Sequence, residues 1–81
     1  MTTTIYTTPT CAFCKATKAF FQEKGVQYKE IDVSSDVAAA QDMVAQSGQM
    51  GVPVTIIKKD NDTKEIIVGF DQKKLVAALG L

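Results

Sequence analysis

The 81-residue sequence contains neither histidine nor arginine. Without histidine, it cannot form the Cys-His pair of a cysteine hydrolase, and it lacks the commonest metal ligand in proteins. Without arginine, it lacks the planar guanidinium that binds carboxylates and phosphates at two points, so lysine or backbone N–H groups would have to recognise any anion. The two absences exclude hydrolysis by a Cys-His pair and any anion site built on arginine.

Neither sign of charge is in excess, because nine lysines balance nine acidic residues. Net charge therefore gives no argument for a nucleic acid or membrane partner. The first residues, Met-Thr-Thr-Thr-Ile-Tyr, have no basic region or long apolar run typical of a signal peptide, and no segment has the length to span a bilayer. We expect a cytoplasmic protein that forms a single small domain over residues 1–81.

The only two cysteines lie in the stretch Thr10-Cys11-Ala12-Phe13-Cys14. They follow a β-prone run and begin an apolar-periodic segment that predicts a helix. In a reducing compartment, C-x-x-C at such a junction is typical of a dithiol redox site. A sulfur at the first turn of a helix faces unpaired N–H groups and the positive end of the helix dipole, and both favour the thiolate.

Two other interpretations of the cysteine pair are an inert pair and half of a structural zinc site. Structural zinc takes four ligands, whereas this chain offers two cysteines and no histidine. Zinc binding would therefore require a dimer.

Hydrophobic periodicity and turn residues predict a βαβ unit followed by a β-hairpin and a last helix. The first two strands should be parallel and joined by a right-handed crossover, with the second strand near an edge of the sheet. The predicted elements are a strand over 3–7, a helix from Thr10 or Cys11 to about Lys24, a strand over 26–33, a helix after Ser34-Ser35-Asp36 that stops at Ser47-Gly48, strands over 54–58 and 65–69 around an Asp60-Asn61-Asp62 turn, and a helix capped by Asp71.

Several apolar side chains are predicted to pack. Phe70 and Leu75 should form a hydrophobic staple at the start of the last helix. Tyr6 should fill the core, although its place before the cysteine motif would also let it line the site. Packing is the simplest role for Met43 and Met50.

Three stretches, in this order, are similar to those of glutaredoxin-like redoxins of the thioredoxin superfamily. They are Cys11-Ala12-Phe13-Cys14, the segment Ser47–Val54 with its Val52-Pro53 step, and Gly69-Phe70-Asp71 before the last helix. The resemblance covers essentially the whole chain. It implies the α/β thioredoxin fold, βαβαββα, with a four-stranded mixed sheet flanked by three helices.

The resemblance also implies a cis peptide bond at Val52-Pro53 that faces the cysteines and offers the Val52 backbone to an extended substrate. From the residues alone, Pro53 could equally begin a strand. The residues expected to bind substrate are Thr8, Phe13, Val52, Pro53, Gly69, Phe70 and Asp71. Phe13 could instead pack into the core.

The predicted function is that of a dithiol thiol-disulfide oxidoreductase. Cys11, nearer the helix terminus and the more exposed sulfur, would attack a protein disulfide, and Cys14, one turn later on the same helix face, would resolve the mixed disulfide. We expect a monomer with no tightly bound cofactor and no metal, with disulfide-containing proteins as substrates.

The electron donor could be glutathione, as a co-substrate, or a thioredoxin reductase. Glutathione-using glutaredoxins usually carry two glycines and an acidic residue before the last helix, and a lysine just before the cysteine motif. This sequence keeps Gly69 and Asp71, but Phe70 replaces the second glycine and Thr7 and Thr8 precede the motif. These departures favour thioredoxin reductase, although Phe70 could equally serve only as the staple residue.

Alternative functions are glutathione-dependent deglutathionylation, iron–sulfur cluster transfer and redox-inert recognition. The second cysteine and the altered glutathione pattern count against a cluster carrier. The intact Cys11, Cys14 and Val52-Pro53 count against an inert domain.

Overall fold

A four-stranded sheet forms the centre of the structure, a computed structural model that describes residues 1–60 and 62–81. The sheet consists of β1 (Thr2–Thr7), β2 (Lys29–Asp32), β3 (Val54–Lys58) and β4 (Lys64–Val68), in the order β2-β1-β3-β4. Strand β1 is parallel to β2 and antiparallel to β3, and β3 and β4 form an antiparallel hairpin. This confirms the predicted pairings and the edge position of β2.

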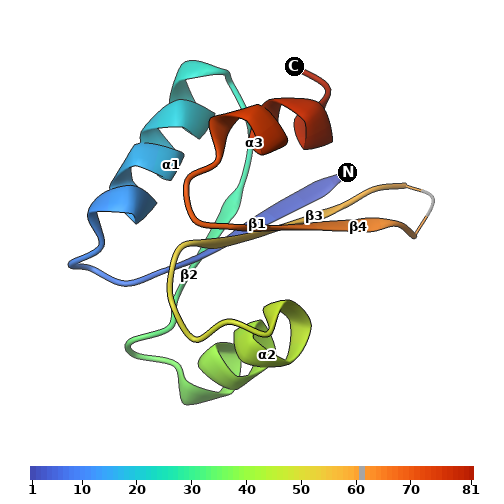
Figure 1. Cartoon of the computed structure of the whole chain (residues 1–81). Coiled ribbons are helices and arrows are strands. Elements are labelled where there is room, and N and C mark those ends of the chain that lie inside the picture. The colour runs from blue at the N-terminus through green and yellow to red at the C-terminus, as the bar shows by residue number, and fades with distance from the viewer. Residues whose placement is uncertain (61) are drawn as a thin grey trace.

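Three helices cover the sheet. Helices α1 (Ala12–Glu23) and α3 (Gln72–Leu79) lie on one face, and α2 (Val37–Ser47) lies on the other (Figure 1). The predicted order βαβαββα is confirmed. No helix in the described part of the chain combines the length and the hydropathy needed to cross a membrane.

Each helix begins at a residue whose side chain accepts the backbone N–H three residues later. These N-caps are Cys11, Asp36 and Asp71, which satisfy one of the free N–H groups at each helix start. Gly25 and Gly48 follow the ends of α1 and α2 with φ of 69° and 70°, a left-handed conformation that glycine adopts without a steric penalty. The predicted helix boundaries are thus confirmed to within a residue.

The larger of two buried clusters lies between the sheet and helices α1 and α3. Phe70 packs against this cluster, which includes Leu75, its predicted staple partner. The cluster comprises Ile5, Phe20, Phe21, Ile57, Ile67, Leu75, Ala78 and Leu79.

The smaller cluster lies between the sheet and α2 and comprises Tyr6, Met43, Val54 and Ile56. Tyr6 and Met43 are buried as predicted. The prediction for Met50 is wrong, because its side chain is 86% exposed. Met50 lies in the loop after α2, and in that loop it is Val52, not Met50, that packs against the core.

The second strand begins later than the sequence predicts, at Lys29 rather than residue 26. The Val26 N–H donates to the Phe21 carbonyl at 2.8 Å, and the tilted rings of Tyr28 and Phe21 have centroids 5.2 Å apart, so this segment first packs on the end of α1. Strand β4 ends at Val68, because Gly69 turns the chain with φ of 78°. The predicted Asp60-Asn61-Asp62 turn includes Asn61, which lies outside the described residues.

Candidate active site

The two cysteines form a disulfide at the start of α1, with Cα atoms 5.2 Å apart. Cys11 is the N-cap residue. Cys14 lies in the first turn, and the Cys14 backbone N–H donates to Cys11 Sγ at 3.0 Å. Cys11 is partly exposed, whereas Cys14 is only 1% exposed. The cysteine at the helix terminus is therefore the more exposed residue of the pair.

The loop before Cys11 is held at both ends. The Cys11 N–H donates to the Thr8 carbonyl at 3.3 Å. The buried Thr7 hydroxyl donates to Glu30 Oε2 at 2.8 Å, and Lys18 on α1 donates to the same oxygen at 2.8 Å. Hydrogen bonds from Lys18 and from Thr7 lower the pKa of the Glu30 carboxyl. One carboxylate thus ties the end of β1 to the cysteine helix.

A surface groove of about 490 Å³ opens beside the cysteine helix. One wall includes the Val52-Pro53 step, whose peptide bond is cis, as the family resemblance implies. The Gly69 N–H donates to the Pro53 carbonyl at 2.8 Å, which holds this wall against the chain leading into α3. We call this feature the cysteine groove; it is lined by Phe13, Val52, Pro53, Val68, Gly69, Phe70, Asp71 and Gln72.

Most of the substrate-binding residues predicted from the sequence meet in the cysteine groove. Thr8 is the exception, since it does not line the groove and instead holds the Cys11 N–H through its carbonyl. Val68 and Gln72 also line the groove and were not among the predicted site residues. Their positions beside Gly69-Phe70-Asp71 were the available signal, because residues flanking a strand-to-helix turn share its surface.

The sequence leaves the roles of Phe13 and Phe70 open, and the structure places both side chains. Phe13 is 66% exposed, so it does not pack into the core. Phe70 lines the groove and also contacts Phe20 edge-on, with ring centroids 6.1 Å apart. Both roles of Phe70 considered in the sequence analysis are therefore compatible with its position.

Tyr6 does not line the cysteine groove. Its hydroxyl donates to Asp42 Oδ2 at 3.0 Å, on the α2 side of the sheet. Burial, together with the hydrogen bond to Asp42, raises the pKa of Tyr6. Tyr6 is therefore a core residue that fastens α2 to β1.

A cysteine pair at a helix start beside a cis-proline, on this fold, defines the redoxin class of proteins. The family model described as Glutaredoxin matches residues 3–61, and the chain belongs to the glutaredoxin family. It is therefore a thiol-disulfide oxidoreductase.

Similar proteins span most of the chain. An uncharacterised glutaredoxin-like 8.6 kDa protein in the rubredoxin operon of Clostridium pasteurianum is 37% identical over 71 residues, which are 88% of each protein. Methanoredoxin from Methanosarcina acetivorans superposes with a TM-score of 0.85 at 28% identity, covering 99% of this chain and 85% of that one. NrdH-redoxin from Escherichia coli, a glutaredoxin-like protein with a thioredoxin-like activity profile, superposes with a TM-score of 0.75 at 30% identity, covering 93% and 92%.

Proposed function

We propose that this protein reduces disulfides of other proteins in the cytoplasm, as a monomer, and that a thioredoxin reductase rather than glutathione restores its dithiol. The observation that carries the proposed disulfide reduction is the asymmetry of the cysteine pair. Cys11 is a partly exposed residue whose sulfur accepts an N–H at the helix terminus, whereas Cys14 is buried one turn behind it.

The reaction begins with the reduced dithiol. The Cys11 thiolate attacks one sulfur of the substrate disulfide, forming a mixed disulfide and releasing the other substrate sulfur as a thiol. The Cys14 thiolate then attacks Cys11 Sγ, which releases the second substrate thiol and leaves the Cys11–Cys14 disulfide. Two electrons pass to the substrate, and the helix terminus supplies the thiolate without a histidine base.

The charge of the cysteine groove supports a donor other than glutathione. Of its eight lining residues, Asp71 alone carries a charge, and that charge is negative. Glutathione bears two carboxylates, which favour a cationic partner, and the groove offers none. The partly buried Phe70 ring also fills space that a second glycine would leave open. We infer that glutathione is at most a weak co-substrate and that no cofactor is tightly bound.

The resemblance to NrdH-redoxin from Escherichia coli also supports thioredoxin reductase as the electron donor. That protein is 30% identical to this chain and has a thioredoxin-like activity profile. Disulfide-containing proteins are then the substrates, and a thioredoxin reductase is the partner that returns electrons.

The test is turnover of a protein disulfide with two electron supplies side by side, glutathione with glutathione reductase and NADPH with thioredoxin reductase. We expect reduction through thioredoxin reductase, loss of activity in Cys11→Ser, and a stable mixed disulfide with substrate in Cys14→Ser. Efficient turnover with glutathione would contradict the donor assignment. Activity that survives in Cys11→Ser would contradict the mechanism.

One substitution tests whether the missing cation limits the use of glutathione. Gln72→Lys adds a cation to the groove at an exposed position on the first turn of α3. If the missing cation limits glutathione use, this variant should raise the glutathione-dependent rate and leave the protein fold unchanged. An unchanged rate would show that charge is not the limit.

A further inference from the structure

The outer edge of β4 adjoins the cysteine groove at Val68. We propose that this edge binds, as an added strand, the extended polypeptide segment that flanks the disulfide of a protein substrate. The inference rests on the proposed reduction of protein disulfides and names the part of the substrate that the protein recognises.

The backbone of β4 offers hydrogen-bonding groups on its outer side. β4 is the last strand of the sheet, and its only neighbour in the sheet order is β3. The Gly69 N–H donates to the Pro53 carbonyl. In an antiparallel pair, the N–H and C=O groups of every second residue before Gly69 therefore also point toward β3. The intervening residues direct their N–H and C=O groups outward, as an unpaired edge does. These residues are Lys64, Ile66 and Val68.

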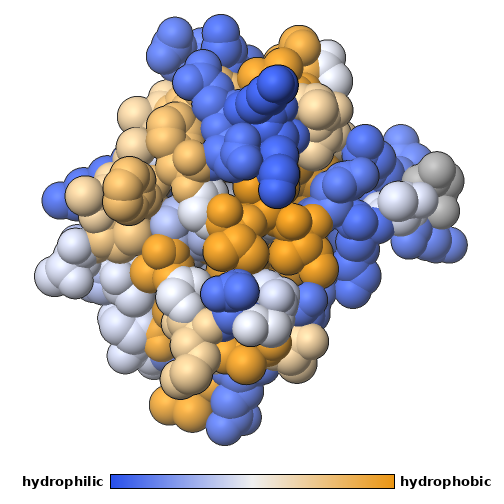
Figure 2. Space-filling view, viewed as in Figure 1, coloured by the Kyte–Doolittle hydropathy of each residue, from blue (hydrophilic) through white to orange (hydrophobic). Residues whose placement is uncertain are grey.

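Apolar side chains accompany these backbone groups. Ile66 is 39% exposed and Val68 is 48% exposed, and Figure 2 shows hydrophobic side chains gathered at the centre of this face. Side chains of an added strand would alternate between the two faces of the sheet, and those on the α2 side would contact Ile66 and Val68.

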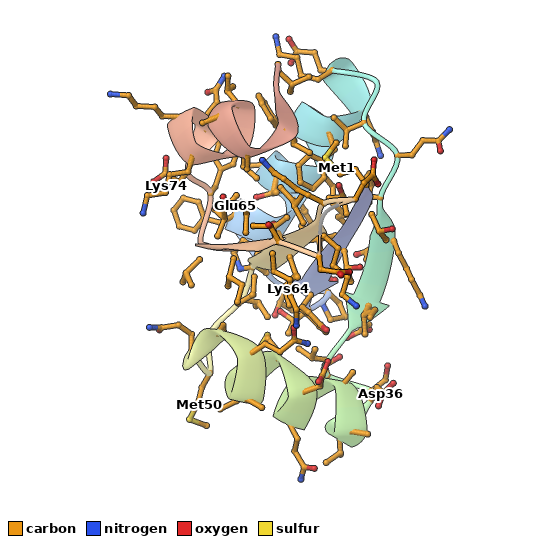
Figure 3. All side chains as sticks on the ribbon, turned by 90° about the vertical axis from the view of Figure 1, so that its right-hand side faces the viewer. Met1, Asp36, Met50, Lys64, Glu65 and Lys74 are labelled. Atoms are coloured by element: carbon orange, nitrogen blue, oxygen red, sulfur yellow. A yellow bond between two sulfur atoms is a disulfide. The ribbon has the colours of Figure 1, made fainter. Side chains whose placement is uncertain are left out.

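On the α3 side, a groove of about 370 Å³ runs along the same edge. Its lining includes the small side chains of Ala77 and Ala78, together with Glu65 and Lys74, which lie on the α3 side of the edge in Figure 3. The groove can accept the alternate side chains of an added strand. Its lining is Glu65, Ile66, Ile67, Lys74, Ala77 and Ala78.

The edge and the cysteine groove are continuous, because Val68 borders both. A chain whose cysteine reaches Cys11 can leave the groove at Val68 and continue along β4. The strand is five residues long, which at about 3.3 Å per residue accommodates a segment of similar length. This continuity favours the substrate chain itself as the occupant.

A second copy of this protein fits the edge less well. Antiparallel self-pairing centred on Glu65 would place two glutamates opposite each other, and like charges in that position are destabilising. Self-pairing centred on Ile66 would place Lys64 against Val68 of the other copy. A five-residue edge is also short for a dimer interface, since stable interfaces bury about 1,200 Å² or more.

The experiment compares two synthetic disulfides with the chemically reduced protein, so that no electron donor is needed. The long probe is an uncharged ten-residue peptide with a Val/Thr/Ile-rich segment and one cysteine joined by a disulfide to free cysteine. The short probe is the same disulfide without the segment. Acid quenching and mass spectrometry follow formation of the Cys11–Cys14 disulfide.

Two variants test the edge and one serves as the matched control. Ile66→Lys removes an apolar contact, and Ile66→Pro removes an outward N–H while leaving the bonds to β3, as an edge strand tolerates. We expect each variant to slow reduction of the long probe about fivefold and to leave the short probe unchanged. Val37→Lys, at a 73% exposed valine on α2, should change neither rate.

Several outcomes would overturn the proposal. These are an unchanged rate with the long probe in both Ile66 variants, an equal loss with both probes, or a loss in Val37→Lys instead. Concentration-dependent dimers in sedimentation that Ile66→Lys abolishes would assign the edge to a second copy. Failure of the unsubstituted protein to reduce either probe would refute the proposed function itself, a result distinct from all of these.

Discussion

The two faces of the sheet are packed to different extents. Among the described residues, the cluster under α1 and α3 contains eight buried residues, whereas the cluster under α2 contains four. On α2, Val37 and Val44 remain 73% and 37% exposed. Because stability follows buried apolar area, most of it should come from the α1/α3 face.

This difference bears on the active site, which is assembled from both faces. The cysteines begin α1, which belongs to the larger cluster, whereas Val52 packs against the smaller cluster. The reacting sulfurs are therefore fixed to the more stable part of the molecule. The groove wall that meets the substrate belongs partly to the less stable part.

Truncations in the two clusters test this comparison most strongly. Phe21 and Met43 are both fully buried, one in each cluster. Phe21→Ala should lower the free energy of unfolding by about 3–5 kcal/mol and Met43→Ala, within a range of about 2–5 kcal/mol, by less, because a smaller side chain is removed from the smaller cluster and leaves a smaller cavity. Urea unfolding measures both. A larger loss in Met43→Ala would reverse the assignment of stability to the two faces.

Replacing one buried hydroxyl on the α1/α3 face of the sheet should stabilise the protein. Thr55 is 0% exposed, pairs with Ile5 and Ile67 across the sheet, and its Oγ1 has no hydrogen-bond partner within the described residues. Thr55→Val keeps the shape and should raise the free energy of unfolding by about 1–2 kcal/mol.

The control is Thr17→Val, because the buried Thr17 hydroxyl donates to the Phe13 carbonyl at 2.8 Å. Thr17→Val should not raise the free energy of unfolding. Equal effects of the two substitutions would contradict the account of Thr55.

On the α2 face, the Tyr6 hydroxyl donates to Asp42. Tyr6→Phe should cost about 1 kcal/mol of unfolding free energy near neutral pH. Because the folded-state pKa of Tyr6 is raised, its contribution is complete below the unfolded pKa of about 10 and is lost as pH rises through the folded value. The free energy of unfolding, measured from about pH 8 to about pH 11, should fall less steeply with rising pH in Tyr6→Phe than in the unsubstituted protein. Parallel profiles would contradict this.

The smallest expected effect concerns Glu30 and acid pH. Its folded-state pKa is lowered, so its contribution is present above the unfolded pKa and is lost as pH falls through the folded value. The Glu30 side chain is 39% exposed, so screening should keep the contribution of its pair with Lys18 below about 1 kcal/mol. Lys18→Met should flatten the acid limb of stability against pH, and an unchanged limb would argue against the pair.

Local signals predicted much of this structure. The caps Cys11, Asp36 and Asp71 lie where the sequence places them, because an N-cap depends on residues only three positions apart. The cis bond before Pro53 came from family resemblance, since the residues alone left it open.

Long-range packing was not readable from the sequence. The apolar pattern of α2 does not say that Met43 is buried while Val37 is exposed, because that depends on how the helix lies on the sheet. Met50 was wrongly predicted to pack for the same reason. The hydrogen bond between Thr7 and Glu30 joins residues 23 positions apart, and no local pattern predicts it.

Selective alkylation of the reduced protein tests whether Cys11 is the attacking thiol. Substoichiometric iodoacetamide at neutral pH, followed by peptide mass mapping, measures the rate at each cysteine. Cys11 should react at least about tenfold faster than Cys14, because it is the more exposed cysteine and lies at the helix terminus. Faster reaction at Cys14, or equal rates at both, would contradict the assignment of Cys11 as the attacking thiol.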